Sequence, residues 1–322
     1  MTLFFNSISG ILTLMIMVAV GIVASRLGWI TEPVNNFLTK FAINVAIPAT
    51  LFVNAIDSLS VEQLSEDWPL LFIPLITIML NILISYLITR VYAAARPRRG
   101  VFILCFSMSN SIFIGLPVCL AIFGKAASSY VTLYYIVNTF IFWSLGASLL
   151  ARDGGKKAGG GLSMLKNLLS PPIFAFLLGL IAVLTGLSHK LPAFIEDAVR
   201  SLAGLNTPLC MLFLSVVIAR LGIKGSLKLP KGGWLVLLGR FIISPAIMVA
   251  ACLIFGVPPL PAGVFTAESA MPVMNQTVIM AHSCGADYEF CSQLMAATVL
   301  LMILFIPLLT LVIGAAFPIV IG

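Results

Sequence analysis

Charged residues are scarce in this chain, and so are the residue types that build most catalytic sites. Asp, Glu, Lys and Arg make up 9% of the 322 residues, whereas soluble domains carry about 25%. There are two histidines, and the six cysteines fall in no metal-ligand spacing. The sequence has no basic stripe of the kind that contacts nucleic acid. These shortages exclude a soluble globular enzyme and predict a protein with no catalytic residues, metal, cofactor or nucleic-acid partner.

Long hydrophobic runs are what the sequence has in abundance. Hydrophobic residues make up 61% of the chain, and the mean hydropathy is +1.14. A helix needs about 20 apolar residues to cross a bilayer, and runs of this length predict ten spans. We therefore expect an all-α polytopic protein in a lipid bilayer, with spans near 4–25, 34–55, 69–90, 100–123, 129–150, 167–187, 196–219, 232–255, 261–283 and 290–314.

The basic residues are unevenly divided between the two sets of loops. Fifteen of the 18 Lys and Arg residues lie in or beside the loops that follow odd-numbered spans, and only Lys125, Lys190 and Arg200 lie on the other side. Cytoplasmic loops of membrane proteins carry an excess of Lys and Arg. The net charge of +7 therefore indicates orientation, and both chain termini are expected outside the cell.

A basic, glycine-rich segment divides the predicted spans into two sets of five. Residues 152–166 form this predicted cytoplasmic linker, between a first repeat at 1–151 and a second at 167–322. Because five is odd, the second set must enter the membrane in the opposite direction. Prolines recur at matching places, Pro48 with Pro208 and Pro117 with Pro272. Such pairs of interrupted spans are typical of secondary transporters, although membrane helices are rich in proline in general.

The fourth predicted span contains the motif Asn110-Ser111-Ile112-Phe113-Ile114-Gly115-Leu116-Pro117. Proline removes a backbone donor and clashes with the preceding turn, so we expect the helix to break or kink near Gly115 to Pro117. At membrane depth, broken backbone survives only where protein or water satisfies its polar groups. Gly115 would let two backbones approach closely. This segment is therefore predicted to form part of a binding site.

The ninth predicted span supplies a partner for this break. Asn275 and Gln276 follow Pro272 closely, and a second unwound segment there would cross the first at mid-membrane. The N-termini of half-helices carry partial positive charge and suit a carboxylate without a lysine. Hydrogen bonding between helices is the alternative role for each of these amides. The predicted substrate-binding residues are Asn110, Gly115, Pro117, Pro272, Asn275, Gln276 and, in support, Asn138.

Other polar residues within the apolar runs are interpreted individually. Asn44, Asn81 and Asn138 are typical of hydrogen bonds between membrane helices, and Asn138 is placed best to support the site because its span follows the broken helix. Glu268 and Arg240 are the only charges clearly inside the spans, where ionisable residues are generally functional. Glu268 is predicted to carry a coupling proton or to face an outer vestibule. Arg240 is predicted to act in coupling or gating, or to extend its stem to the interface.

At the motif of span 4 the sequence resembles the auxin efflux carrier family, which includes plant auxin exporters and bacterial permeases of small carboxylates. Further resemblance lies in three stretches, Asn44 to Phe52, Ala270-Met271-Pro272, and Thr298 to Leu309 with Pro307. The resemblance implies the ten-span inverted-repeat fold of sodium/proton antiporters. It implies a scaffold of spans 1, 2, 6 and 7 and a mobile transport domain of spans 3–5 and 8–10. The ligand-contacting Asn of the family corresponds to Asn110.

The departures from the plant proteins favour the bacterial permease branch, because span 3 offers only Asn81 where plant exporters carry charged residues. The sequence therefore predicts a multi-pass protein of the bacterial inner membrane. Its predicted activity is secondary transport of a small organic anion, such as malonate, malate or an auxin-like acid, by an elevator motion. Coupling to a proton or sodium gradient and a homodimer through the scaffold helices are left open. The alternatives are a sodium-coupled symporter of the bile-acid type, a channel and a membrane sensor.

Overall fold

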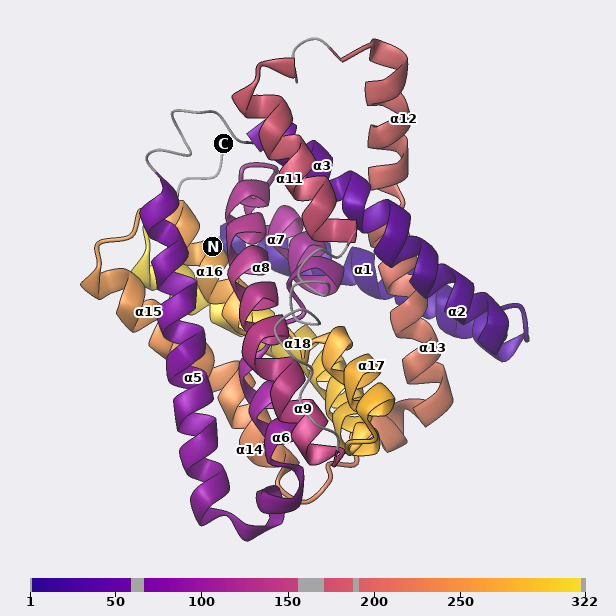
Figure 1. The fold of residues 1–322 in the computed structure, drawn as a ribbon, viewed down its shortest axis with the longest axis vertical. Coiled ribbons are helices and arrows are strands. Elements are labelled where there is room, and N and C mark those ends of the chain that lie inside the picture. Colours follow the sequence, from indigo (N-terminus) through magenta and orange to yellow (C-terminus); the bar gives the residue numbers. More distant parts are fainter. Residues whose placement is uncertain (1, 59–66, 156–170, 188–190, 320–322) are drawn as a thin grey trace.

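A computed structural model describes residues 2–58, 67–155, 171–187 and 191–319 of the chain (Figure 1). Over these residues the secondary structure is helical, apart from one isolated β-bridge between Ser109 and Val273. The predicted linker at 152–166 lies mostly outside the described residues. Proline, glycine and short π turns divide many of the helices into shorter pieces.

The first part of the chain contributes the elements up to Asp153. They are α1 (Thr2–Arg26), α2 (Glu32–Phe41), η1 (Ala42–Ala46), α3 (Ile47–Ser58), η2 (Trp68–Leu71), α5 (Phe72–Val91), η3 (Ala93–Arg98), α6 (Arg99–Ser107), η4 (Ser111–Gly115), α7 (Leu116–Phe123), α8 (Ala127–Ile141), η5 (Phe142–Gly146) and α9 (Ala147–Asp153).

The second part contributes the remaining elements. They are α11 (Pro171–Leu184), α12 (Ala193–Gly204), α13 (Asn206–Ser226), α14 (Gly233–Leu238), η7 (Gly239–Ile243), α15 (Ser244–Ile254), α16 (Pro259–Ser269), α17 (Asn275–Cys284) and α18 (Tyr288–Ala316).

Seven stretches among the described residues are helical, long and apolar enough to cross a membrane. They confirm the predicted class of all-α polytopic membrane protein, while the count of ten spans stays a prediction. The seven are Ile8–Arg26, Glu32–Asp57, Trp68–Val91, Ala127–Asp153, Ala193–Arg220, Gly233–Ile254 and Tyr288–Ala316. Two shorter apolar helices, Ser111–Phe123 and Pro171–Leu184, fall below this length.

The helices pack in two groups. In one group α3 lies beside α11 and α12, and α1 packs against α13 (Figure 1). In the other, α6 packs against α5, α9 and α18, and α16 packs against α8 and α15. Residues 100–107 of α6 and 261–269 of α16 are buried all round. Helices that are apolar and buried on every side lie at the centre of a bundle, so these two form the core of their group.

The break in the fourth span is not at Gly115 to Pro117, and that prediction is wrong. The chain leaves helical geometry at Met108 to Asn110, and Pro117 lies in the first turn of α7. The five-residue π turn η4 ends two residues before Pro117, and the Leu116 N–H donates to the Ser111 carbonyl across it.

The π turn explains why this proline does not break the helix. Proline clashes with the carbonyl of the residue four positions earlier, and a π turn is wider than an α turn. Residue 113, whose carbonyl would meet the ring of Pro117, lies in the middle of η4. The same arrangement recurs with η1 before Pro48 and with η7 before Pro245. In each case the widened turn accommodates the ring, and the helix continues.

Candidate functional site

Two broken helices cross in the interior of the protein. The segment after α6 and the segment between α16 and α17 run antiparallel and pair as a single β-bridge between Ser109 and Val273. The Asn110 N–H donates to the Pro272 carbonyl over 3.0 Å. Ser109 and Val273 are fully buried. Unwound backbone in a membrane interior must find partners within the protein, and here each broken segment supplies partners for the other.

Local sequence explains where the chain unwinds in the second helix. The residue before a proline is disfavoured in the α conformation, so the helix cannot run smoothly from Met271 into Pro272. Helical geometry resumes only after Met274, whose backbone is extended. In the first helix Met108 is likewise extended, and the Asn110 carbonyl then accepts the N–H of Gly115 over 3.0 Å. Pro272 therefore lies inside its break, as predicted, whereas Pro117 lies beyond its own.

Side chains from two further helices hold the crossing backbone in place. Asn138 on α8 accepts the Ser109 N–H over 3.3 Å and donates to the Ser109 carbonyl over 2.9 Å, as a neighbouring strand would. Thr298 on α18 accepts the Val273 N–H over 3.1 Å. Both side chains are fully buried. Ser109 and Val273 pair with each other, so Asn138 and Thr298 each bond to the outer side of one of the two paired segments.

Arg240 does not extend to the interface, and that interpretation of its position is wrong. It is fully buried in η7 and donates from Nε to the Met271 carbonyl over 3.0 Å. Its Nη1 donates to the Phe106 carbonyl over 3.3 Å, and its Nη2 donates to the Ser109 hydroxyl over 2.6 Å and to the Met271 carbonyl.

The position of Arg240 suits its charge. The carbonyls of Phe106 and Met271 belong to the C-terminal ends of α6 and α16. Helix C-termini carry partial negative charge and unpaired carbonyls, which a cation stabilises. The planar fork of a guanidinium can serve several acceptors at once. One arginine thus joins the ends of both half-helices and the bridge residue Ser109, whose hydroxyl is also 3.0 Å from the Tyr134 hydroxyl.

The N-terminal end of α17 carries polar groups that have no partner within the described structure. Asn275, the first residue of α17, is buried with 1% exposure, and neither its Oδ1 nor its Nδ2 makes a hydrogen bond. The Thr277 hydroxyl is buried and equally unpaired. Buried polar groups are nearly always hydrogen-bonded. At this positive end of a half-helix, a small anion could accept from the Asn275 Nδ2 and from the Thr277 hydroxyl.

Glu268 lies on α16 against the other broken helix. It is fully buried, and an ideal Cβ built on Gly115 would lie 2.3 Å from Glu268 Oε1. The Cys119 thiol donates to Oε1 over 3.4 Å, while Oε2 has no hydrogen-bond partner. Gly115 therefore permits a close approach, as predicted, but the group that approaches is a carboxyl and not a second backbone.

Replacing Gly115 with alanine is expected to destabilise the protein by about 1–3 kcal/mol, the usual effect of overpacking a core. The new methyl group would displace the buried Glu268 carboxyl, because the ideal Cβ would lie within 3 Å of three of its atoms. The measurement is thermal unfolding of the purified protein in detergent. Gly204→Ala is the matched control, because a Cβ on Gly204 meets nothing within 4 Å. A double variant with Glu268→Ala should recover part of the loss, and strict additivity would contradict the proposed contact.

The remaining predicted residues are placed as follows. Asn110 lies in the break with 5% exposure, and Gln276 is half-buried in the first turn of α17. Asn81 accepts the Ser244 hydroxyl over 3.0 Å, a hydrogen bond between α5 and α15. Asn44 donates to the Lys40 carbonyl within its own helix, away from the crossing. Contact with a ligand stays a prediction for every one of these residues.

Sequence reasoning missed Ser109, Tyr134 and Thr298. Ser109 directly precedes the predicted Asn110, and Thr298 begins the stretch of resemblance in the last span. One signal was available: Thr298 follows Val273 by 25 positions, and the predicted Asn138 follows Ser109 by a similar 29. Each polar residue thus lies one helix further along the chain than the broken segment that it contacts.

A cavity of about 850 Å³ opens at one end of the molecule, between the two packing groups. Lysine, arginine and hydroxyl side chains from both groups line it, with Asn54, Lys125, Ser128, Tyr130 and Arg200 among them. Within the described residues none of the crossing residues lines this cavity. Tyr130 connects the two regions, because Phe265 packs against the rings of both Tyr130 and Tyr134.

The apolar helices and the buried crossing of two broken helices define an integral membrane protein. The family model described as membrane transport protein matches residues 7–160 and 160–310, and the chain belongs to this family, the auxin efflux carrier family. An uncharacterized transporter of Methanothermobacter thermautotrophicus is 28% identical over 313 residues, which cover 96% of this chain and 99% of the relative. An uncharacterized transporter of Methanocaldococcus jannaschii is 25% identical over 292 residues, which cover 90% and 92%.

Proposed function

We propose that this protein is a secondary active transporter of a small organic anion, a mono- or dicarboxylate, and that the anion binds at the crossing. The observation that carries the proposal is the state of Asn275. Its amide is buried at the start of a half-helix with both polar atoms unpaired, and a buried amide without partners is costly unless a ligand supplies them. A carboxylate would accept from Nδ2 and from the N–H groups that begin α17.

The charge at the crossing agrees with an anionic ligand. Arg240 contributes a guanidinium there, and no ion pair within 4 Å neutralises it among the described residues. The four hydrogen bonds that it donates go to two carbonyls and a hydroxyl, so it raises the local potential without occupying the ligand position. Asn110, in the other broken segment, would contact the anion from the opposite side. Gln276 is the remaining amide within the same turn.

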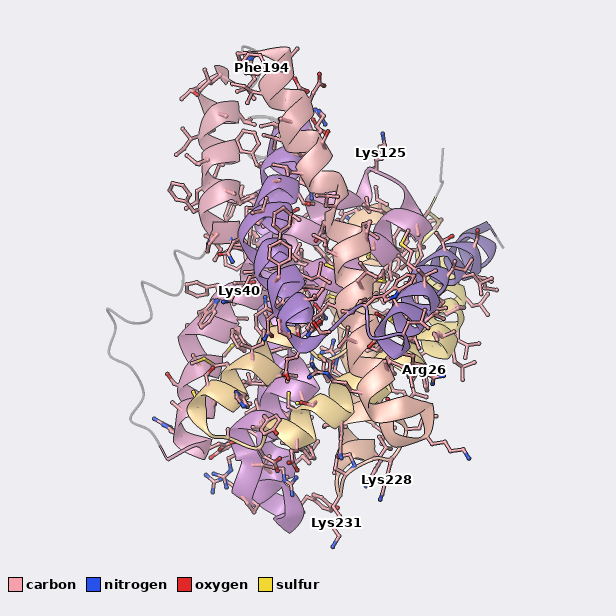
Figure 2. All side chains as sticks on the ribbon, turned by 90° about the vertical axis from the view of Figure 1, so that its right-hand side faces the viewer. Arg26, Lys40, Lys125, Phe194, Lys228 and Lys231 are labelled. Atoms are coloured by element: carbon pink, nitrogen blue, oxygen red, sulfur yellow. The ribbon has the colours of Figure 1, made fainter. Side chains whose placement is uncertain are left out.

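The proposed architecture is ten spans in two inverted repeats, 1–151 and 167–322, with the termini outside a plasma membrane. The scaffold would comprise spans 1, 2, 6 and 7. In support, α1 packs against α13 and α3 packs against α11, while α1 also contacts α7 and α18 of the other group. Spans 3–5 and 8–10 would then move as an elevator. Lys125 and Phe194 lie toward one end of the molecule and Lys228 and Lys231 toward the other, with Arg26 and Lys40 between them (Figure 2). Lys125 is thus separated from Lys228 and Lys231, as the assignment of these loops to opposite sides requires.

Purified protein in lipid vesicles is expected to take up radiolabelled malonate or malate with saturation, and to show counterflow when the vesicles contain unlabelled substrate. Alternating access predicts counterflow because unlabelled substrate leaving the vesicle returns the binding site to the outer face. Labelled substrate then binds there and is carried inward. Protein-free vesicles are the control. Flux that fails to saturate would indicate a channel, and uptake that requires a sodium gradient would indicate a sodium-coupled symporter. Absence of flux across a panel of mono- and dicarboxylates would contradict the proposal.

A further inference from the structure

Glu268 is a buried carboxyl that the crossing itself does not use. It has 0% exposure, and its Oε2 makes no hydrogen bond within the described structure. Its Oε1 accepts the Cys119 thiol, a weak donor, and the Ser111 hydroxyl also interacts with the carboxyl. The carboxyl packs against the backbone of Gly115 so closely that no Cβ would fit there. The Gly115 N–H donates a hydrogen bond to the Asn110 carbonyl. Glu268 therefore lies one contact away from the broken segment that would hold the anion.

The groups around Glu268 do not provide a counter-ion. Ser111 and Cys119 face it from the other broken helix, and Tyr134 faces it from α8. The other titratable groups on the helices packed against α16 are Tyr130, Tyr135, Cys252, Tyr288, Glu289 and Cys291. None of these is a cation. Arg240 interacts electrostatically with Glu268 from a distance, but it forms no ion pair with the carboxyl within 4 Å. An isolated carboxylate in an apolar interior is far more costly than the neutral acid.

We propose that Glu268 is the proton-binding residue that couples anion transport to a proton gradient. This inference rests on the proposed transport function. With Glu268 neutral, Arg240 leaves the crossing with one net positive charge, which favours an anion. When the carboxyl O–H bond breaks and the proton leaves to water, the resulting carboxylate cancels that charge and disfavours the anion. A proton and the anion therefore cross together, and neither has a favourable site alone.

The contact with Gly115 gives the coupling a short structural route. Gly115, through its N–H, and Asn110, through its carbonyl, close the turn that starts the second half of the broken helix. Ionisation of the adjacent carboxyl would draw donors toward it, and one of its donors, the Ser111 hydroxyl, lies in this turn. The protonation state of Glu268 would thus act on the position of Asn110 as well as on the local potential.

The first test detects the protonated form of Glu268 directly and needs no substrate. Infrared spectra of wild-type protein in lipid nanodiscs at neutral pH should contain the carbonyl stretch of a protonated carboxylic acid, and Glu268→Gln should lack it. Glu289→Gln is the matched control, since Glu289 is an exposed carboxylate in the first turn of α18 and its removal should leave the band unchanged. Absence of the band in wild-type protein, or its persistence in Glu268→Gln, would overturn the proposal.

The second test reads coupling with malonate as the probe. At mildly alkaline pH, where malonate is fully ionised and carries no proton of its own, adding it outside vesicles that contain a pH-sensitive dye should acidify the lumen with wild-type protein and with Glu289→Gln. With Glu268→Gln the acidification should fall to the level of protein-free vesicles while malonate counterflow continues. Equal acidification in wild type and Glu268→Gln would overturn the coupling role. If wild-type protein moves no anion, the transport proposal and the coupling role both fail, and the infrared band alone decides whether Glu268 holds a proton.

Discussion

Replacing Asn275 with alanine is expected to lower uptake of a small carboxylate, measured well below saturation in reconstituted vesicles, by roughly 10- to 150-fold. This range corresponds to losing one hydrogen bond to a charged group, about 1.5–3 kcal/mol. The thermal stability of the purified protein should stay unchanged or rise, because both polar atoms of the amide are unpaired before the substitution. Combining this change with Asn110→Ala should reduce uptake to background.

Asn138 provides the matched control for this experiment. It is also a buried asparagine beside the crossing, but its amide is already bonded to both backbone groups of Ser109. Asn138→Ala should therefore lower thermal stability, because it leaves the N–H and the carbonyl of Ser109 without these hydrogen bonds, whereas Asn275→Ala should not. Undiminished uptake by Asn275→Ala would exclude this residue from the binding site. A marked loss of stability on that substitution would show that the amide has a structural partner.

Replacing Arg240 with methionine is expected to remove about 3–5 kcal/mol of stability, a large fraction of the total for a folded protein. Methionine fills similar space but leaves the carbonyls of Phe106 and Met271 and the hydroxyl of Ser109 without their hydrogen-bond donor. The stability of Arg240→Lys should lie between those of the wild type and Arg240→Met, because an ammonium keeps the charge but lacks the planar fork. The measurement is thermal unfolding in detergent, together with the fraction of protein that elutes as a single species.

Arg220 is the comparison residue for this prediction. Its only ion pair among the described residues is with Glu32 at 3.7 Å on the surface, and exposed pairs contribute about 0–1 kcal/mol. Arg220→Met should therefore behave like the wild type in both measurements. If Arg240→Met melts at the same temperature as Arg220→Met, the role of Arg240 at the crossing is wrong.

Patterns that belong to single segments were predictable from the sequence. Apolar runs predicted the all-helical membrane class, and the motif ending in Pro117 predicted the family that the family model confirms. The backbone interruption at Pro272 follows from the covalent geometry of proline, which acts on the nearest residues. These features need no knowledge of what packs against the segment.

Features set by distant contacts were not predictable in the same way. Pro117 has the same covalent restrictions as Pro272, yet a π turn accommodates it and the helix breaks seven residues earlier, where Ser109 can pair with Val273. Arg240 resembled an ordinary interfacial arginine because only the fold brings Phe106, Ser109 and Met271 to it. The sequence showed which residues were unusual for a membrane interior, but not which of them would meet.

The dependence of each broken helix on the other has a consequence for biosynthesis. Ser109 and Arg240 are separated by 131 residues, and ribosomes add about 5–20 residues per second, so roughly 7–26 seconds pass between their syntheses. Throughout that interval the first unwound segment lacks both its arginine and its bridge partner. The nascent N-terminal part of the chain must therefore stay in another conformation, or remain bound to the insertion machinery, until the later helices are made and can complete the crossing.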